Sequence, residues 1–271
     1  MEIARGNIKN DFFDTYLSVK FELMRYLKSR RLLIVGALAV IVPLIFYVKT
    51  PNSAGVFAAL VLDTMGVFIA ISAAMFTGDA VNGEFEKKTN LLSFPTPQRR
   101  FSIFLGKYIA ALLATYFVVL LYYVTMTLQT AQLYGWGEIP TALGKSFLIA
   151  LLSATAMVSV VFFFSSILKR SIASTIVSLL FIMWVLEAAR LILTLVNQEP
   201  WFIATYSASL LKDVLGVSES LAFSPEEHIK EQFGITLTVF KPDFGVGIAV
   251  LVSYAIAFLA GGLAIAVRRE E

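Results

Sequence analysis

The chain has 271 residues, of which 58% are hydrophobic and only 15% are charged, and its mean hydropathy is +0.79. Apolar runs of this kind, longer than about 17 residues, indicate membrane-spanning helices and exclude both a water-soluble domain and the short alternating strands of a membrane barrel. The absence of cysteine and the presence of a single histidine, His228, exclude a disulfide framework and a Cys/His metal site. We therefore predict an all-α integral membrane protein without a metal site.

The first predicted element is an amphipathic helix at residues 11–31. Apolar side chains such as Phe13, Leu17 and Met24 recur there at helical spacing, against charged side chains such as Lys20. An apolar run follows directly. The helix is therefore expected to lie in the membrane interface, where its basic groups meet lipid headgroups.

Six apolar segments are long enough to cross a bilayer as helices that satisfy their own backbone hydrogen bonds. We predict these spans at residues 32–48, 54–77, 101–128, 147–168, 172–196 and 244–267. Pro43 interrupts the first span, and neighbouring helices can accommodate it. The whole chain, residues 1–271, is predicted to form a single membrane domain.

The distribution of basic residues predicts the topology. With the N-terminus in the cytoplasm, sixteen Lys and Arg residues lie inside and five lie outside, as expected from the positive-inside rule. Both termini are then cytoplasmic, residues 78–100 form a cytoplasmic loop and residues 197–242 form an extracellular segment. Within that segment, residues 201–215 are expected to lie on the membrane as a helix. The net charge of +3 is thereby attributed to topology, and no nucleic-acid partner is predicted.

The stretch from Asp79 to Lys107 is the longest polar interruption between apolar segments in the first half of the chain. It carries too many charges to lie in hydrocarbon, so we expect it in water, with Lys107 reaching up from the head of the third span. A short amphipathic piece and then Pro95 and Pro97 predict a small helix with a stiff exit. Such a surface suits a soluble partner.

Sequence motifs for catalysis are missing. The chain has no GxxxxGK[ST] loop for nucleotide phosphates, no HExxH and no GxSxG. No catalytic residue and no cofactor are therefore predicted in this chain.

Three charged residues within the predicted spans are candidates for a substrate path, because a charge in hydrocarbon is costly unless it is paired or hydrated. Asp63 lies near the middle of the second span, and either lines a path or subunit interface or is hydrogen-bonded within the bundle. Glu187 and Arg190 lie three residues apart in the fifth span. They either neutralise each other on one helix face, which we favour, or contribute to the path.

The polar stretch matches a family pattern at these residues: Asp79, Gly83-Glu84-Phe85-Glu86, Thr89, Leu91-Leu92, Pro97, Arg100 and Gly106-Lys107. They resemble the loop after the second span of ATP-binding-cassette (ABC) exporter permeases of the second type, where the pattern runs D, GE-x-E-x-GT, LL, P-x-x-R and GK. Lys88 stands where the family has a glycine. The order of helices extends the resemblance over the whole chain.

The resemblance implies that residues 11–31 are the family's connecting elbow helix and that residues 82–92 form its coupling helix, which docks on a separate ABC ATPase. ATP and Mg would then bind to that partner chain, and a second permease chain would complete the path in a prokaryotic cell membrane. The implied coupling residues are Asn82, Gly83, Glu84, Phe85, Glu86, Lys87, Lys88, Thr89 and Arg100.

Two other classes remain open: an ATPase-independent secondary transporter or channel, and a membrane enzyme or scaffold. No internal repeat of the kind common in secondary transporters is evident. A secondary carrier should depend on a proton or sodium gradient. A membrane enzyme should retain turnover when purified alone.

Overall fold

The computed structural model describes residues 8–46, 53–86, 100–216 and 240–269, and all regular elements in these ranges are helical. The all-α prediction is therefore confirmed for this part of the chain. In order, the helices are α1 (Ile8–Leu27), α2 (Arg30–Ile45), α3 (Ala54–Asp63), α4 (Met65–Thr77), α5 (Asn82–Glu86), α7 (Arg100–Tyr134), η2 (Trp136–Glu138), α8 (Leu143–Ile167), α9 (Ser171–Leu180), η3 (Phe181–Val185), α10 (Leu186–Leu195), α11 (Ala204–Ala208), α12 (Leu210–Asp213) and α14 (Phe244–Arg268).

Five helical segments among the described residues are long and apolar enough to cross a membrane. They are Ala54–Thr77, Arg100–Tyr134, Leu143–Ile167, Ser171–Leu195 and Phe244–Arg268, and each overlaps one predicted span. The remaining predicted span, residues 32–48, begins in α2, whose helix has 16 residues in the structure. Residues 47 and 48 lie outside the described ranges.

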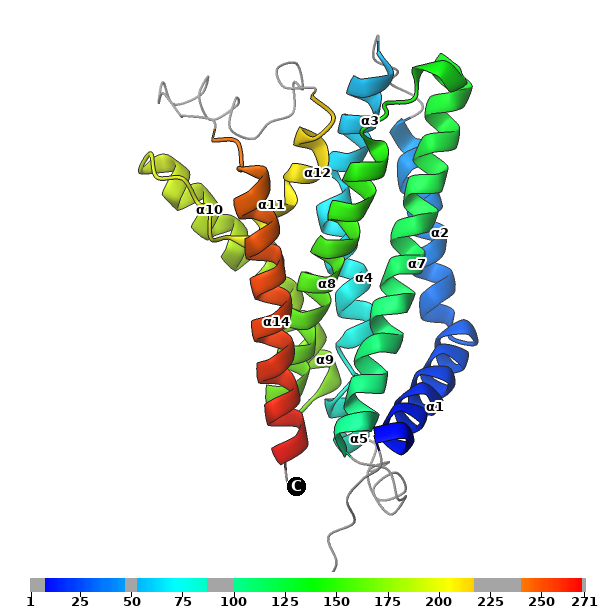
Figure 1. Cartoon of the computed structure of the whole chain (residues 1–271), viewed down its shortest axis with the longest axis vertical. Coiled ribbons are helices and arrows are strands. Elements are labelled where there is room, and N and C mark those ends of the chain that lie inside the picture. Colours follow the sequence, from blue (N-terminus) through cyan, green and yellow to red (C-terminus); the bar gives the residue numbers. More distant parts are fainter. Residues whose placement is uncertain (1–7, 47–52, 87–99, 217–239, 270–271) are drawn as a thin grey trace, which may run out of the picture.

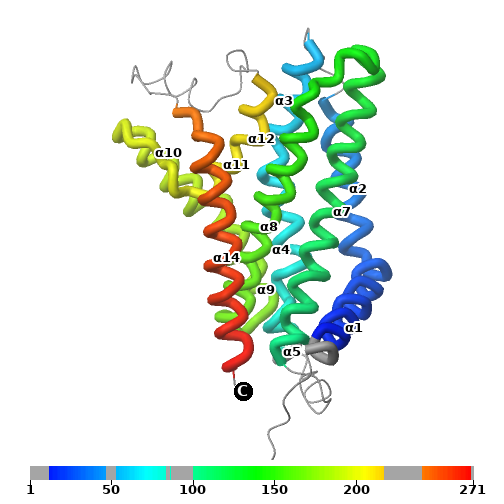
Figure 2. The backbone as a smooth tube through the Cα atoms, viewed as in Figure 1, coloured from blue at the N-terminus to red at the C-terminus, as the bar shows by residue number. Residues whose placement is uncertain are grey.

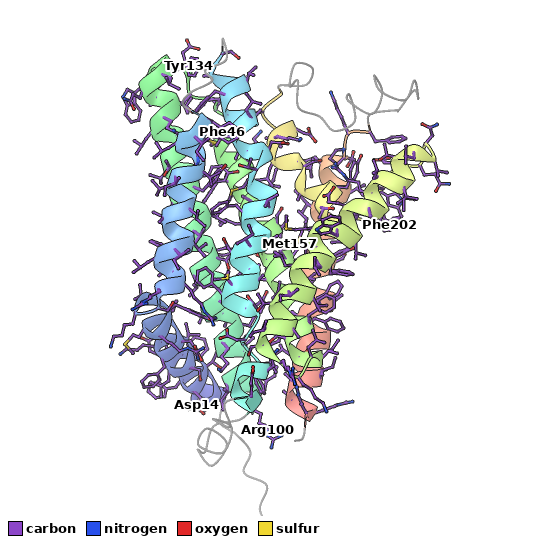
Figure 3. The ribbon with its side chains drawn as sticks, turned by 180° about the vertical axis from the view of Figure 1, so that it is seen from behind. Asp14, Phe46, Arg100, Tyr134, Met157 and Phe202 are labelled. Carbon is purple, nitrogen blue, oxygen red and sulfur yellow. The ribbon has the colours of Figure 1, made fainter. Side chains whose placement is uncertain are left out.

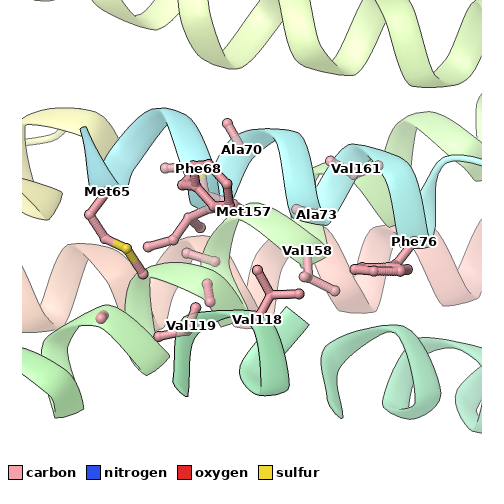
Figure 4. Close-up of a cluster of buried hydrophobic side chains, with 14 of the residues drawn as sticks. Met65, Phe68, Ala70, Ala73, Phe76, Val118, Val119, Met157, Val158 and Val161 are labelled. Atoms are coloured by element: carbon pink, nitrogen blue, oxygen red, sulfur yellow. The ribbon is translucent and has the colours of Figure 1, made fainter. Parts of the chain in front are cut away.

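The long helices run side by side as a bundle, with α4, α7 and α8 packed together at its centre (Figure 1). The smooth tube in Figure 2 shows α1 crossing the foot of α7 at an angle, with α14 beside α8. α4 has no polar face, and such a helix is stable only where it is covered on most sides. Its side chains Phe68 and Phe76 accordingly pack with Val118 of α7 and Met157 of α8 (Figure 4).

The second span is interrupted at Thr64, between α3 and α4. The buried Tyr122 of α7 donates its hydroxyl to the carbonyl oxygen of Val61 at 2.6 Å, and the Thr64 hydroxyl donates to the same oxygen at 3.0 Å. These bonds satisfy a carbonyl at the end of α3, so the break is a stable feature of the packing.

α7 runs from Arg100 to Tyr134 and is longer than the predicted span, which ended at residue 128. Its 35 residues correspond to about 52 Å of helix. The polar residue Gln129 does not end the helix because it is buried and donates its side-chain amide to the carbonyl oxygen of Pro43 at 3.2 Å. Pro43 in turn stays inside α2.

The prediction of a single helix on the membrane surface at residues 201–215 is wrong. The structure has two short helices there, α11 and α12, which turn back into the bundle against α8 and α14 (Figure 1). Tyr206, Leu210 and Leu211 are buried in these contacts. Burial of these side chains explains why the segment leaves the surface. Residues 217–239 lie outside the described part.

Candidate functional site

The end of the bundle where the chain leaves α4 brings together α1, α5, the start of α7 and the turn between α8 and α9; we call it the α5 end (Figure 1). Figure 3 shows Asp14 of α1 and Arg100 of α7 at this end, and Phe46 and Tyr134 at the opposite end. Most of the described residues of the Asp79 to Lys107 motif lie at this end.

Asp79 is buried at the end of α4, with only 5% of its side chain exposed. Its Oδ2 atom pairs with Arg31 Nη1 at 3.1 Å and with Arg25 Nη2 at 3.5 Å. Both arginines are about half exposed, so they neutralise the carboxylate while keeping their own hydration. The expectation that this end of the polar stretch lies in water is wrong for Asp79, which ties α4 to the corner between α1 and α2.

Tyr26 of α1 strengthens the same junction. Its hydroxyl donates to the carbonyl oxygen of Phe76 at 2.7 Å, and its ring packs edge-on against the ring of Phe76. Burial, and then the nearby carboxylates of Glu22 and Asp79, raise the pKa of the Tyr26 hydroxyl. The hydroxyl therefore stays protonated and remains a donor over the whole physiological pH range.

Gly106 and Lys107, at the start of the third span, contact α1 directly. Lys107 Nζ pairs with Glu22 Oε1 of α1 at 2.9 Å, and both side chains are nearly buried, at 7% and 13% exposure. A Cβ atom on Gly106 would lie 2.5 Å from Ser18 Cβ and 3.2 Å from the carbonyl oxygen of Thr15. The missing side chain thus lets α1 approach α7, and the lysine, which was expected only to reach for solvent, holds it there.

α5 is bound to the turn between α8 and α9. The Asn82 Oδ1 atom accepts hydrogen bonds from the hydroxyls of Ser165, at 3.4 Å, and Ser171, at 3.3 Å. The Glu86 Oε2 atom accepts the backbone N–H of Ser171 at 2.9 Å. Because Ser171 is the first residue of α9, Glu86 satisfies an amide at a helix N-terminus and adds a favourable charge there.

The predicted coupling residues therefore divide into two groups. Asn82, Gly83 and Glu86 lie against α9, while Arg100 begins α7 and donates to the carbonyl oxygen of Arg269 at 3.5 Å. The others have no described side chain: Glu84, Phe85, Lys87, Lys88 and Thr89.

The candidate residues for a substrate path do not form one cluster with these. Asp63 ends α3 in the half of the bundle away from the α5 end and pairs with Lys212 of α12 at 2.6 Å, a partner that sequence reasoning missed. Glu187 and Arg190 pair with each other on α10 at 3.1 Å, which confirms the favoured interpretation of those two charges. No three Asp, Glu or His side chains converge as a metal site would require within the ranges described above.

Replacing Asn82 with alanine is expected to lower the free energy of unfolding by about 1–3 kcal/mol, since it deprives the buried hydroxyl of Ser165 and the partly buried hydroxyl of Ser171 of their shared acceptor. The measurement is reversible unfolding in mixed micelles with increasing dodecyl sulfate. Gln198→Ala, at an exposed amide, is the control and should leave the midpoint unchanged. Equal midpoints for both variants would contradict the prediction.

Comparison with protein families decides what kind of membrane protein this is. The model of the ABC-2 family transporter proteins matches residues 16–200. The chain belongs to this family. It is therefore a membrane-spanning permease of an ABC transporter, and the match includes Glu22, Asp79, Asn82 and Lys107 of the α5 end. Comparison with curated proteins gave no match.

Proposed function

We propose that this permease works with a separate ABC ATPase, which docks on residues 79–100 and binds the ATP and Mg, and that the complex exports its substrate. One observation carries the proposal: α5, five residues long, is bonded to the start of α9 while Asp79 beside it is bonded to α1 and α2. The segment from Asp79 to Glu86 is thus bonded to α1 and α2 through Asp79 and to α9 through α5, as expected of a segment that passes a displacement from a docked partner to the bundle.

The bonds define where a displacement of α5 would travel. α4 leads directly into it, α9 is attached through Asn82 and Glu86, and α1 is attached through Asp79. Coupling between two sites needs a packed element that both sites can bias, and α4 is such an element because most of its side chains are buried. ATP-driven movement of α5 would thus reach the second and fifth spans together.

The proposed topology has six spans, with α2 as the first and both termini in the cytoplasm of a prokaryotic cell. Aromatic side chains of α1 that point away from the bundle, among them Phe12, Phe13 and Tyr16, support its place in the membrane interface. Ser171–Leu195 and Phe244–Arg268 expose most of their side chains in the single chain. Lipid and a second permease chain are the partners proposed for these faces.

A photo-crosslinker at position 85 in α5 tests the proposal. We expect it to trap a soluble chain with a P-loop, and the purified complex to show vanadate-sensitive ATPase activity. A crosslinker at Trp136, which is exposed on η2 at the opposite end, is the control and should not trap that chain. Recovery of the permease alone, with transport that follows a proton or sodium gradient, would instead establish a secondary transporter.

A further inference from the structure

A second set of polar contacts lies far from the α5 end, where α12 meets the break in the second span. Lys212 Nζ contacts Asp63 Oδ1 at 2.6 Å. Asp63 is the tenth of the 24 residues of Ala54–Thr77, so it lies well inside the span. Both side chains are partly exposed, at 44% for Asp63 and 34% for Lys212.

Two adjacent tyrosines of α7 hold the elements that carry this pair. Tyr122 donates to the Val61 carbonyl at the end of α3. Tyr123 lies 2.8 Å from the Ser146 hydroxyl, and Ser146 donates to the carbonyl oxygen of Leu211 in α12 at 2.6 Å. The chain of contacts from α3 through α7 and α8 to α12 is closed into a ring by the ion pair.

Of the contacts in this ring, the ion pair costs the least free energy to replace by contacts with water. The tyrosine and serine hydroxyls are buried, and leaving one without a partner costs about 1–3 kcal/mol. Where water reaches both charges, by contrast, an ion pair contributes only about 0.2–1 kcal/mol. Separation of Asp63 and Lys212 nevertheless requires water at both charges, because an unhydrated charge inside a span costs about 3 kcal/mol.

From this geometry we propose that the Asp63–Lys212 ion pair is a latch. It holds α12, and through α12 the adjoining α11, against the break in the second span, and it opens only when water reaches the pair. Asp63 lies immediately before Thr64, where the helix ladder is already interrupted. α4 begins beyond the break and leads to α5. Movement of α4 can therefore pull Asp63 away from Lys212 without unfolding either helix.

The latch can be tested in the permease alone, since the chain has no cysteine and a single reporter can be introduced. Ser207 of α11 is fully buried, and a thiol there should be protected from a polar maleimide. In the Ser207→Cys protein in lipid nanodiscs, we expect Asp63→Asn or Lys212→Met to raise the labelling rate at least fivefold. The double exchange Asp63→Lys with Lys212→Asp should restore protection.

Lys145→Met is the matched control, because it removes one exposed lysine at the start of α8, near the same end of the bundle. It should leave the labelling rate unchanged. If both single variants at the pair label as slowly as the parent, packing of Leu210 and Leu211 holds the segment and the latch is refuted. Failure of the double exchange to restore protection would refute it as well.

Opening of the latch during transport rests on the proposed function and is tested separately. With cysteines at positions 63 and 212, a short reversible bifunctional thiol reagent should abolish transport by the complex, and reductant should restore it. ATPase binding at α5 should survive the cross-link. Full transport by the cross-linked protein would show that the Asp63–Lys212 contact does not open during transport. If the ATPase does not bind even to the protein that was not cross-linked, the proposed function itself is wrong.

Discussion

Replacement of Lys107 by methionine is expected to lower the free energy of unfolding by about 3 kcal/mol, because it leaves the carboxylate of Glu22 in a nearly buried site without its closest partner. Breaking a buried pair by removing one member is far more damaging than losing an exposed pair. Arg25 lies 3.2 Å from the other carboxylate oxygen of Glu22 and still neutralises part of its charge. We therefore expect a loss of stability at the low end of the range for broken buried ion pairs.

Unfolding in mixed micelles measures this effect, and two further variants show whether the pair is its cause. Lys20→Met removes an exposed lysine from α1, the helix that carries Glu22, and should change the midpoint little. Adding Glu22→Gln to Lys107→Met removes the uncompensated charge and should recover more than half of the loss. A double variant that is less stable than Lys107→Met would show that the ion pair is not what holds α1 on α7.

The order of helices was predictable from the sequence because it depends on local properties. Apolar length and the position of charges predicted five spans that the structure describes, and the spacing of Glu187 and Arg190 predicted their pairing within one helix turn. The motif at Asp79 to Lys107 also predicted the family, which the family match confirms. Each of these signals is contained in a few tens of residues.

Contacts between distant segments were not predictable in the same way. Lys212 lies 149 positions beyond Asp63, and nothing in the composition of residues 197–242 shows that part of this segment packs back into the bundle. The break at Thr64 depends on Tyr122 of another helix. Burial of Gln129, which lengthens α7 beyond its predicted end, depends on the carbonyl of Pro43.

The site residues themselves show the same division. The resemblance implied that Asn82 is a coupling residue and that Glu86 either meets the partner ATPase or braces the interface that passes on its movement. The structure adds contacts of both residues with Ser171 of α9, and their action on a partner stays a prediction. Asp79 and Lys107 looked like solvent-side charges, yet each is buried beside a charge from α1, Arg25 and Glu22 respectively. The sequence does not show which distant residue will pair with a charged side chain, so a charge that is buried in an ion pair is taken to be exposed.

Gly106→Ala is expected to lower the free energy of unfolding by about 1–3 kcal/mol, the usual effect of overpacking a close contact. The new Cβ would lie 2.5 Å from Ser18 Cβ and 3.3 Å from the backbone nitrogen of Val19, so α1 has to move as a whole. Movement of α1 would also lengthen the Lys107–Glu22 contact. The alanine should thus act on stability through both packing and charge.

A second substitution on the facing helix distinguishes this close contact from a general effect of alanine in α7. Ser18→Gly removes the nearest clashing atom, so the Gly106→Ala, Ser18→Gly double variant should be more stable than Gly106→Ala alone, although glycine within a helix itself costs about 1 kcal/mol. Gly144→Ala, at a position in α8 with no atom near the new Cβ, should not be destabilising. If Ser18→Gly only adds its own loss to that of Gly106→Ala, the two helices do not meet at these residues. If it rescues, the glycine of the Gly106-Lys107 pair is required because α1 lies directly on it, and the lysine beside it is positioned by the same contact.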